Sequence, residues 1–279
     1  MKPKSHKRKK DAIEDFVRVA KRIRKSILRI IYNGKAPHIG PSFSLVEILV
    51  ALYYKCMNVS PSNCQDPSRD RFILSKGHGC PALYAVLADR GFLPPHDIKT
   101  FGHDGGVLEE HPMYDLNKGI EASTGSLGHG LSLAAGMALS SKYDNISNKI
   151  FTIVGCGETN AGFIWEAALF AAQHKLDNLI VIVDYNKIQA LGNNDTIIDL
   201  EPYSDKWCSF GWSVREVNGH NFSELFSAFE DVPFEKGKPN VIIAHTVKGK
   251  GVSFMENSLL WHYRCPNKQE YVRAVKELS

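Results

Sequence analysis

A glycine turn between two apolar segments carries the residue types that bind a diphosphate. Gly155 and Gly157 follow the apolar run 151–154, and a helix-forming stretch comes next. Only glycine lets backbone N–H groups approach phosphate oxygens closely, and a helix that starts there directs its positive dipole at the anion. A Gly-x-Gly turn after a strand is weak evidence by itself, because many such turns only connect a strand to a helix.

The second apolar segment, 179–183, ends in two polar residues, Asp184 and Asn186. The carboxyl ends of parallel strands meet at one edge of a sheet, so we expect Asn186 to lie near the glycine turn. Its amide oxygen, the backbone carbonyl of Ile188 and two phosphate oxygens would suit Mg²⁺. In the alternative interpretation, which these residues alone would favour, Asn186 only forms a turn after a buried strand.

The elements that position these residues alternate between strands and helices. The pattern predicts one α/β domain with a mostly parallel sheet and helices on both faces. The expected helices are 11–32, 45–54, 81–90, 131–141 and 223–230, and the expected strands are 71–74, 151–154, 179–183, 213–217 and 240–245. Ser44 with Glu47 three residues later predicts a capping box at the start of helix 45–54. Residues 91–120 are expected to form an extended surface loop.

Composition restricts the class of protein further. The chain has 279 residues and 43% hydrophobic content, enough for a substantial core. Its six cysteines form no Cys-x-x-Cys pair, which indicates a reducing, cytoplasmic location and argues against a disulfide frame or a zinc site. No apolar run approaches the ~20 residues that span a bilayer, so we expect no membrane partner.

The positive charge is concentrated at the N-terminus. Six of the basic residues lie in 1–10, so the rest of the chain carries about −2 of the formal net charge of +4. We expect 1–10 to be a disordered basic tail and 11–279 to be the single domain. No nucleic-acid recognition motif appears, and no nucleic-acid partner is expected.

Several further blocks resemble, in order, the N-terminal half of transketolases, and together they cover nearly all of residues 12–270. They are Pro-His38-Ile-Gly, Ser75-Lys-Gly-His78-Gly, Glu-His111-Pro, Thr124-Gly-Ser-Leu-Gly-His-Gly-Leu-Ser, the glycine turn with Asn186, and Ala244-His-Thr-Val-Lys-Gly-Lys-Gly followed by Trp261-His262. The glycine turn is similar to the thiamine-diphosphate motif of that family. The best match is the split form, in which this half is its own polypeptide.

The resemblance implies roles for individual residues. Four histidines would line the active site and assist proton transfer, namely His38, His78, His111 and His262. The cofactor contacts would come from Gly125, Leu127, Gly155, Gly157, Glu158, Asn186 and His78. Glu166 would belong to a carboxylate network at a subunit interface, although its simpler interpretation is a solvated helix charge. His129 either faces a phosphate or caps a helix, and Lys248 and Lys250 either contact a phosphate or form a solvated basic loop.

Three residues depart from the family pattern. Cys156 stands where the family has a metal-binding aspartate, Ala161 where it has a glutamate, and Tyr263 where it has glycine. The expected metal ligands are Asn186, Ile188 and, at the aspartate's position, Cys156. Mg²⁺ prefers oxygen to sulfur, so two outcomes are open. Either water replaces the carboxylate in a weaker Mg²⁺ site, which we favour, or the site no longer holds metal.

The implied activity is that of a transketolase (EC 2.2.1 class), which transfers a two-carbon ketol unit between sugar phosphates or nucleotide-linked sugars with thiamine diphosphate and Mg²⁺. The glutamate that activates the cofactor lies in the family's second half. The resemblance therefore implies a separate C-terminal subunit with the pyrimidine-binding domain, and an assembly that is a dimer of heterodimers, that is, a heterotetramer. The alternatives are a non-catalytic or regulatory subunit of the same fold and a synthase that uses this cofactor on pyruvate.

Overall fold

The computed structural model describes residues 4–279, and its centre is a five-stranded sheet in which every strand pair is parallel. The strands are β1 (Arg71–Leu74), β2 (Ile150–Gly155), β3 (Leu179–Tyr185), β4 (Ser213–Asn218) and β5 (Asn240–His245), in the order β1-β2-β3-β5-β4. Strand β3 is buried along its whole length, as expected for a continuous apolar run inside a parallel sheet. The predicted α/β fold is confirmed.

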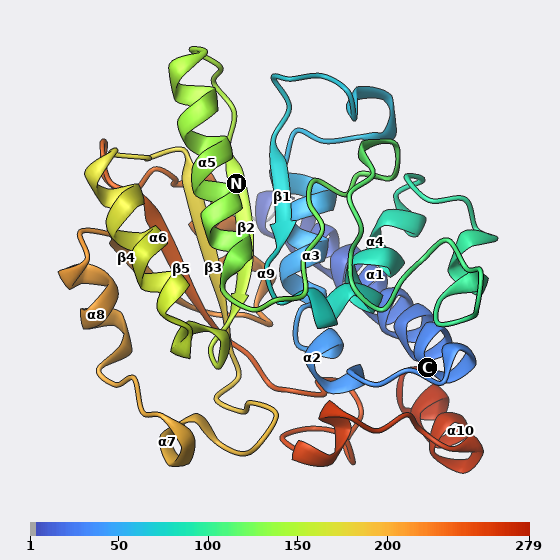
Figure 1. The fold of residues 1–279 in the computed structure, drawn as a ribbon. Coiled ribbons are helices and arrows are strands. Elements are labelled where there is room, and N and C mark those ends of the chain that lie inside the picture. Colours follow the sequence, from blue (N-terminus) through green and yellow to red (C-terminus); the bar gives the residue numbers. More distant parts are fainter. Residues whose placement is uncertain (1–3) are drawn as a thin grey trace.

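Helices cover both faces of the sheet (Figure 1). Their bounds are α1 Lys4–Gly34, α2 Ile39–Phe43, α3 Val46–Ala51, α4 Cys80–Asp89, α5 His129–Tyr143, α6 Gly162–Gln173, α7 Asn194–Ile197, α8 Tyr203–Ser209, α9 Phe222–Glu230 and α10 Lys268–Glu277. One core cluster contains the buried side chains of α1, α3, α4 and α9, and the other contains those of α5, α6 and α8. The sheet therefore lies between two apolar layers.

The strand register places the ends of the central strands side by side. Gly155 at the end of β2 pairs with Asp184 on β3, and Asp184 pairs with Ala244 on β5. The turn after each of these strands consequently starts at the same edge of the sheet. This is the edge at which parallel α/β sheets bind ligands.

The N-terminal helix is longer than its apolar periodicity predicts. Helix α1 begins at Lys4, within the decapeptide for which the sequence predicts a disordered tail, and residues 1–3 lie outside the described residues. Lysine and arginine have good helix propensities, and adding residues to an existing helix avoids the cost of nucleation.

The predicted capping box at Ser44 is wrong. Helix α3 has Leu45 at its N-cap, and the Ser44 hydroxyl instead donates to the carboxylate of Asp184, at 2.7 Å. Glu47 is buried and forms a bidentate ion pair with Arg24, in which both N–O distances are 2.7 Å. A buried carboxylate requires such a partner, and this requirement outweighs a local bond to the helix start.

Residues 91–120 contain only short 3₁₀ turns, as expected of a loop, but the loop is anchored in the core. The side chains of Phe92, Phe101 and Leu108 are buried there. The segment Ile39–Cys56 is long and apolar enough to cross a bilayer, yet 83% of it is buried within the fold, as is usual for core helices of globular domains.

Candidate active site

A pocket of about 320 Å³ opens at the carboxyl edge of the sheet. Its lining contains the predicted residues His38, His78, His111, His262, Gly125, Leu127, Gly155, Gly157, Glu158, Cys156, Asn186 and Ile188. These residues come from turns that are far apart in sequence, and the sheet register brings them together. The individual catalytic and binding roles stay predictions.

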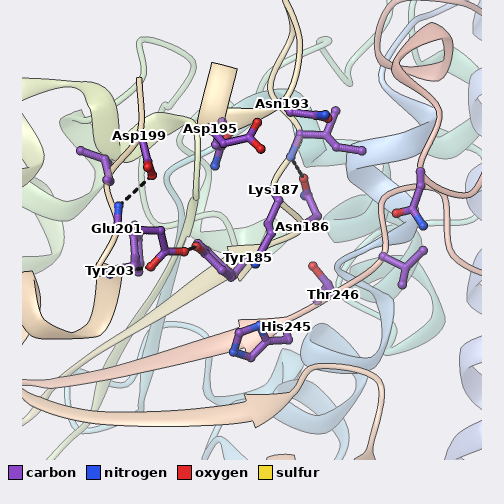
Figure 2. A pocket seen from close by; sticks show the side chains of 15 residues that line it. Tyr185, Asn186, Lys187, Asn193, Asp195, Asp199, Glu201, Tyr203, His245 and Thr246 are labelled. Carbon is purple, nitrogen blue, oxygen red and sulfur yellow. Dashed lines mark hydrogen bonds between the residues drawn. The ribbon is translucent and has the colours of Figure 1, made fainter. Parts of the chain in front are cut away.

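A larger hollow of about 760 Å³ lies next to this pocket and shares Asn186 and Ile188 with it (Figure 2). Its wall comes mainly from residues 185–203 and 245–247, and Tyr185 donates a hydrogen bond to Glu201 across it. The four predicted catalytic histidines do not line this hollow. We therefore assign the candidate active site to the smaller pocket.

Three of the histidines form a tight cluster. The ring centroids of His38, His78 and His262 lie 5.1–5.5 Å apart. Burial lowers the pKa of His38 to about 4 and that of His262 to about 3, and neighbouring positive groups add to both shifts. Burial likewise holds the pKa of His78 well below its usual value. At neutral pH these imidazoles are uncharged. His38 and His78 therefore each have a nitrogen that can accept a hydrogen bond or a proton, whereas the accepting nitrogen of His262 is bonded to the Lys248 ammonium.

Glycines bring the pocket loops close together. A Cβ on Gly77 would lie 2.9 Å from the backbone nitrogen of Gly125, and a Cβ on Gly125 would lie 2.9 Å from the ring of His111. A Cβ on Gly157 would lie 2.9 Å from that of Gln189. These contacts leave no space for larger residues, which explains the glycines that the sequence pattern singled out.

Glu158 lines the pocket, and its expected contact with the cofactor stays a prediction. Its buried carboxylate accepts hydrogen bonds from the amides of Gly155 and Gly128, both at 2.9 Å, and from the Ser75 hydroxyl. A carboxylate so engaged fixes the two glycine turns in place, and burial raises its pKa above the usual value. The amide of Gly157 donates no hydrogen bond within the described part of the chain, so it is free to bind an anion.

The residues expected to hold Mg²⁺ do not fit that ion. The thiol of Cys156 is buried with its sulfur 4.0 Å from the Asn186 amide oxygen, and burial raises the pKa of the thiol above its usual value. The same amide oxygen accepts a hydrogen bond from the Ile188 amide, at 3.1 Å. Among the described side chains, those of residues 13–279, no group of three or more His, Cys, Asp or Glu is arranged to hold a metal ion. Mg²⁺ sites in proteins usually include at least one carboxylate, and here a buried thiol with a raised pKa stands in its place.

The buried carboxylate of Asp184, which lies beside Asn186, is fully engaged. It accepts hydrogen bonds from Lys76 at 2.6 Å, Ser44 at 2.7 Å and Asn186 at 3.0 Å, and a further one from Thr246. Burial would raise the pKa of Asp184, but the Lys76 ammonium lowers it below the usual range. Asp184 therefore remains a paired anion and cannot replace the missing metal ligand.

The interpretation of Lys248 as part of a solvated loop is wrong. Its side chain is 1% exposed, and its ammonium donates to the Ile188 carbonyl at 3.0 Å and to Nδ1 of His262 at 2.7 Å. Burial, followed by the positive charge of Lys76, lowers the pKa of Lys248 to about 7. In contrast, Lys250 is partly exposed and pairs with Glu256, at 3.3 Å.

Two predicted residues lie outside the pocket. Glu166 is exposed on α6, and its expected role at a subunit interface stays a prediction. His129 is the exposed first residue of α5, and its ring packs on Phe163 with the centroids 4.5 Å apart.

Tyr263, which stands where the family has glycine, lines the pocket and is 62% exposed. Its ring centroid lies 4.7 Å from that of His262.

Comparison with known proteins identifies the class. Residues 17–278 match the family model described as the thiamine diphosphate binding domain of transketolase. The chain therefore belongs to the transketolase family.

Within that family it is similar to separately encoded subunits over nearly their full length. It is 41% identical to an apulose-4-phosphate transketolase subunit of Phocaeicola vulgatus, over 92% of this chain and 91% of that one. It is 45% identical to the 6-deoxy-6-sulfo-D-fructose transketolase subunit SqwG of a Clostridium species, over 95% and 96% of the two chains. Among solved structures, transketolase from Campylobacter jejuni superposes with a TM-score of 0.86 and 28% identity, over 95% of this chain and 43% of that one. The chain thus spans less than half of that single-chain enzyme.

Proposed function

We propose that this chain is the N-terminal subunit of a split transketolase and transfers a two-carbon ketol unit from a ketose to an aldose. The observation that carries the proposal is the convergence of the histidine cluster and the glycine turn in one pocket at the sheet edge. The named substrates of the subunit relatives, apulose 4-phosphate and 6-deoxy-6-sulfo-D-fructose, are both anionic sugars. We extend that substrate class, an anionic ketose, to this chain.

Thiamine diphosphate would supply the stabilisation of the carbanion when bound. The Gly157 amide and the Lys248 ammonium would hold its diphosphate, because both are donors on the pocket wall. The neutral imidazoles of His38 and His78 would hold sugar hydroxyls and accept or return their protons, since both are uncharged at neutral pH. His262, whose Nδ1 accepts from Lys248, would donate a hydrogen bond to a sugar oxygen through Nε2. No step of this proposal requires the expected Mg²⁺, because the ligands do not fit it.

The pocket is only half of the site that the family uses. Leu127 and Tyr263 line the pocket and are 41% and 62% exposed, so apolar surface remains uncovered there. We propose that a separate subunit with the pyrimidine-binding domain covers it, that two copies of each chain assemble as a heterotetramer, and that the enzyme is cytoplasmic.

Mixing the two purified subunits tests this function. We expect ketol transfer from xylulose 5-phosphate or 6-deoxy-6-sulfo-D-fructose to an aldose phosphate when both subunits and thiamine diphosphate are present. Neither subunit should be active by itself, because neither contains the complete cofactor site. A mixture that binds the cofactor but transfers no ketol group from either donor would contradict the assignment.

The second candidate is a non-catalytic subunit of the same fold. Cys156 and Ala161 favour it, because both replace carboxylates of the family pattern. Such a subunit would associate with the pyrimidine-domain partner without taking up thiamine diphosphate. Saturable cofactor binding by the purified pair would exclude it.

A further inference from the structure

We propose that the ammonium group of Lys248 takes the place of the divalent metal ion in this subunit, so that the diphosphate of the cofactor binds without a divalent cation. This inference rests on the proposed function and specifies how that site recognises its cofactor. It follows from the charges, the position and the rigidity of the lysine.

The pocket contains more positive than negative charge on its lysines and their partners. Two buried lysines line the pocket, and one of them, Lys76, has a carboxylate partner, Asp184, at 2.6 Å. For Lys248, no carboxylate lies within ion-pair distance in the part of the chain that the structure describes. A buried charge without a counter-charge is costly, so an anion entering the pocket would be stabilised by this ammonium.

The Lys248 ammonium occupies the position expected for the metal ion. Its nitrogen lies 3.0 Å from the carbonyl oxygen of Ile188, the atom that the sequence assigns to the metal. It lies 3.3 Å from the carbonyl oxygen of Gln189, in the same turn. A divalent cation on the Ile188 carbonyl would be repelled by the ammonium already bound there. The carboxylate that would offset this repulsion is absent, because Cys156 occupies its place.

Lys248 is held in place by its surroundings. A Cβ on Gly40 would lie 3.2 Å from Cγ of Lys248, so the aliphatic part of the side chain packs directly on that glycine. The amide of Gly249 donates to the Gly40 carbonyl at 3.0 Å, and the amide of Asn257 donates to the Lys248 carbonyl at 2.8 Å. The ammonium is therefore positioned before any ligand arrives, which reduces the entropic cost of binding.

Calorimetric titration of thiamine diphosphate into the complex of both unmodified subunits tests the inference. The titration is run in EDTA, in Mg²⁺ and in Zn²⁺, the last because zinc binds thiolates well. We expect dissociation constants that agree within ~3-fold in all three buffers, since this corresponds to less than 1 kcal/mol. Binding that weakens ~10-fold or more in EDTA would overturn the inference and leave the proposed function intact. Absence of binding in every buffer would overturn both.

A matched pair of lysine variants adds an independent readout. In EDTA, Lys248→Met should weaken cofactor binding ~30-fold or more, as expected when one member of a buried charge pair is removed. Lys250→Met removes a partly exposed lysine of the same loop and should leave the dissociation constant unchanged. Equal affinities for Lys248→Met and the unmodified complex would contradict the inference. If Lys248→Met fails to fold, the inference is tested by the comparison of dissociation constants in the three buffers with the unmodified complex.

Discussion

Replacing Lys76 by methionine should lower the free energy of unfolding by about 3–5 kcal/mol, the usual cost of leaving one buried member of an ion pair without its partner. The ammonium of Lys76 lies 2.6 Å from the carboxylate of Asp184, and both side chains are buried between the central strands and α2. Methionine keeps the length and apolar character of the lysine stem, so the loss is mainly one of charge. Urea unfolding followed by circular dichroism would measure the change.

A surface ion pair of the same length serves as the control. Lys238 and Glu235 also lie 2.6 Å apart, but both side chains are about half exposed. Lys238→Met should change the free energy of unfolding by less than about 1 kcal/mol, because solvent screens exposed pairs. An equal decrease in the free energy of unfolding for the two substitutions would show that burial does not increase the contribution of the Lys76–Asp184 pair to stability.

Replacing His38 by asparagine should reduce kcat/KM for ketol transfer ~10²–10⁴-fold, the usual contribution of a positioned acid or base. The His38 ring lies at the pocket, within 5.1 Å of His78 and 5.4 Å of His262 between ring centroids. Asparagine is suited to this position, because the backbone of His38 has a φ of 73° and asparagine tolerates that left-handed conformation better than most residues. Steady-state kinetics on the reconstituted pair would measure the loss.

His103→Asn is the matched control, because His103 is exposed in the loop 91–120 and does not line the pocket. This variant should retain the kcat/KM of the unmodified pair. The melting temperature of His38→Asn should stay close to that of the unmodified protein, which would separate a loss of chemistry from a loss of folding. A His38→Asn pair that is as active as the control would remove His38 from the catalytic set.

The sheet and much of the pocket could be predicted from the sequence. Strands β2 and β3 are nearly continuous apolar runs, and such runs predict a sheet buried on both faces without knowledge of tertiary contacts. The glycine turns mark the ends of these strands, and parallel strands bring their carboxyl ends to one edge. Local patterns therefore sufficed to place Gly155, Gly157 and Asn186 in one site.

The charge network could not be predicted, because its members are far apart in the sequence. Lys76 and Asp184 are separated by 108 residues, and Ser44 and Asp184 by 140 residues. The spacing of apolar residues along the chain carries no information about such pairings. The local pattern therefore indicates a helix cap at Ser44 and allows a solvated loop at Lys248. The carboxylate of Glu158 could not be assigned for the same reason, since two of its three partners lie in other loops.

The central claim is that this pocket binds thiamine diphosphate with the glycine turn and Lys248. A crystal structure of the two-subunit complex with thiamine diphosphate, grown in EDTA, tests it most directly. We predict density for the diphosphate between the Gly157 amide and the Lys248 ammonium, with no metal ion beside Cys156. An empty pocket, or a diphosphate bound elsewhere, would contradict the account.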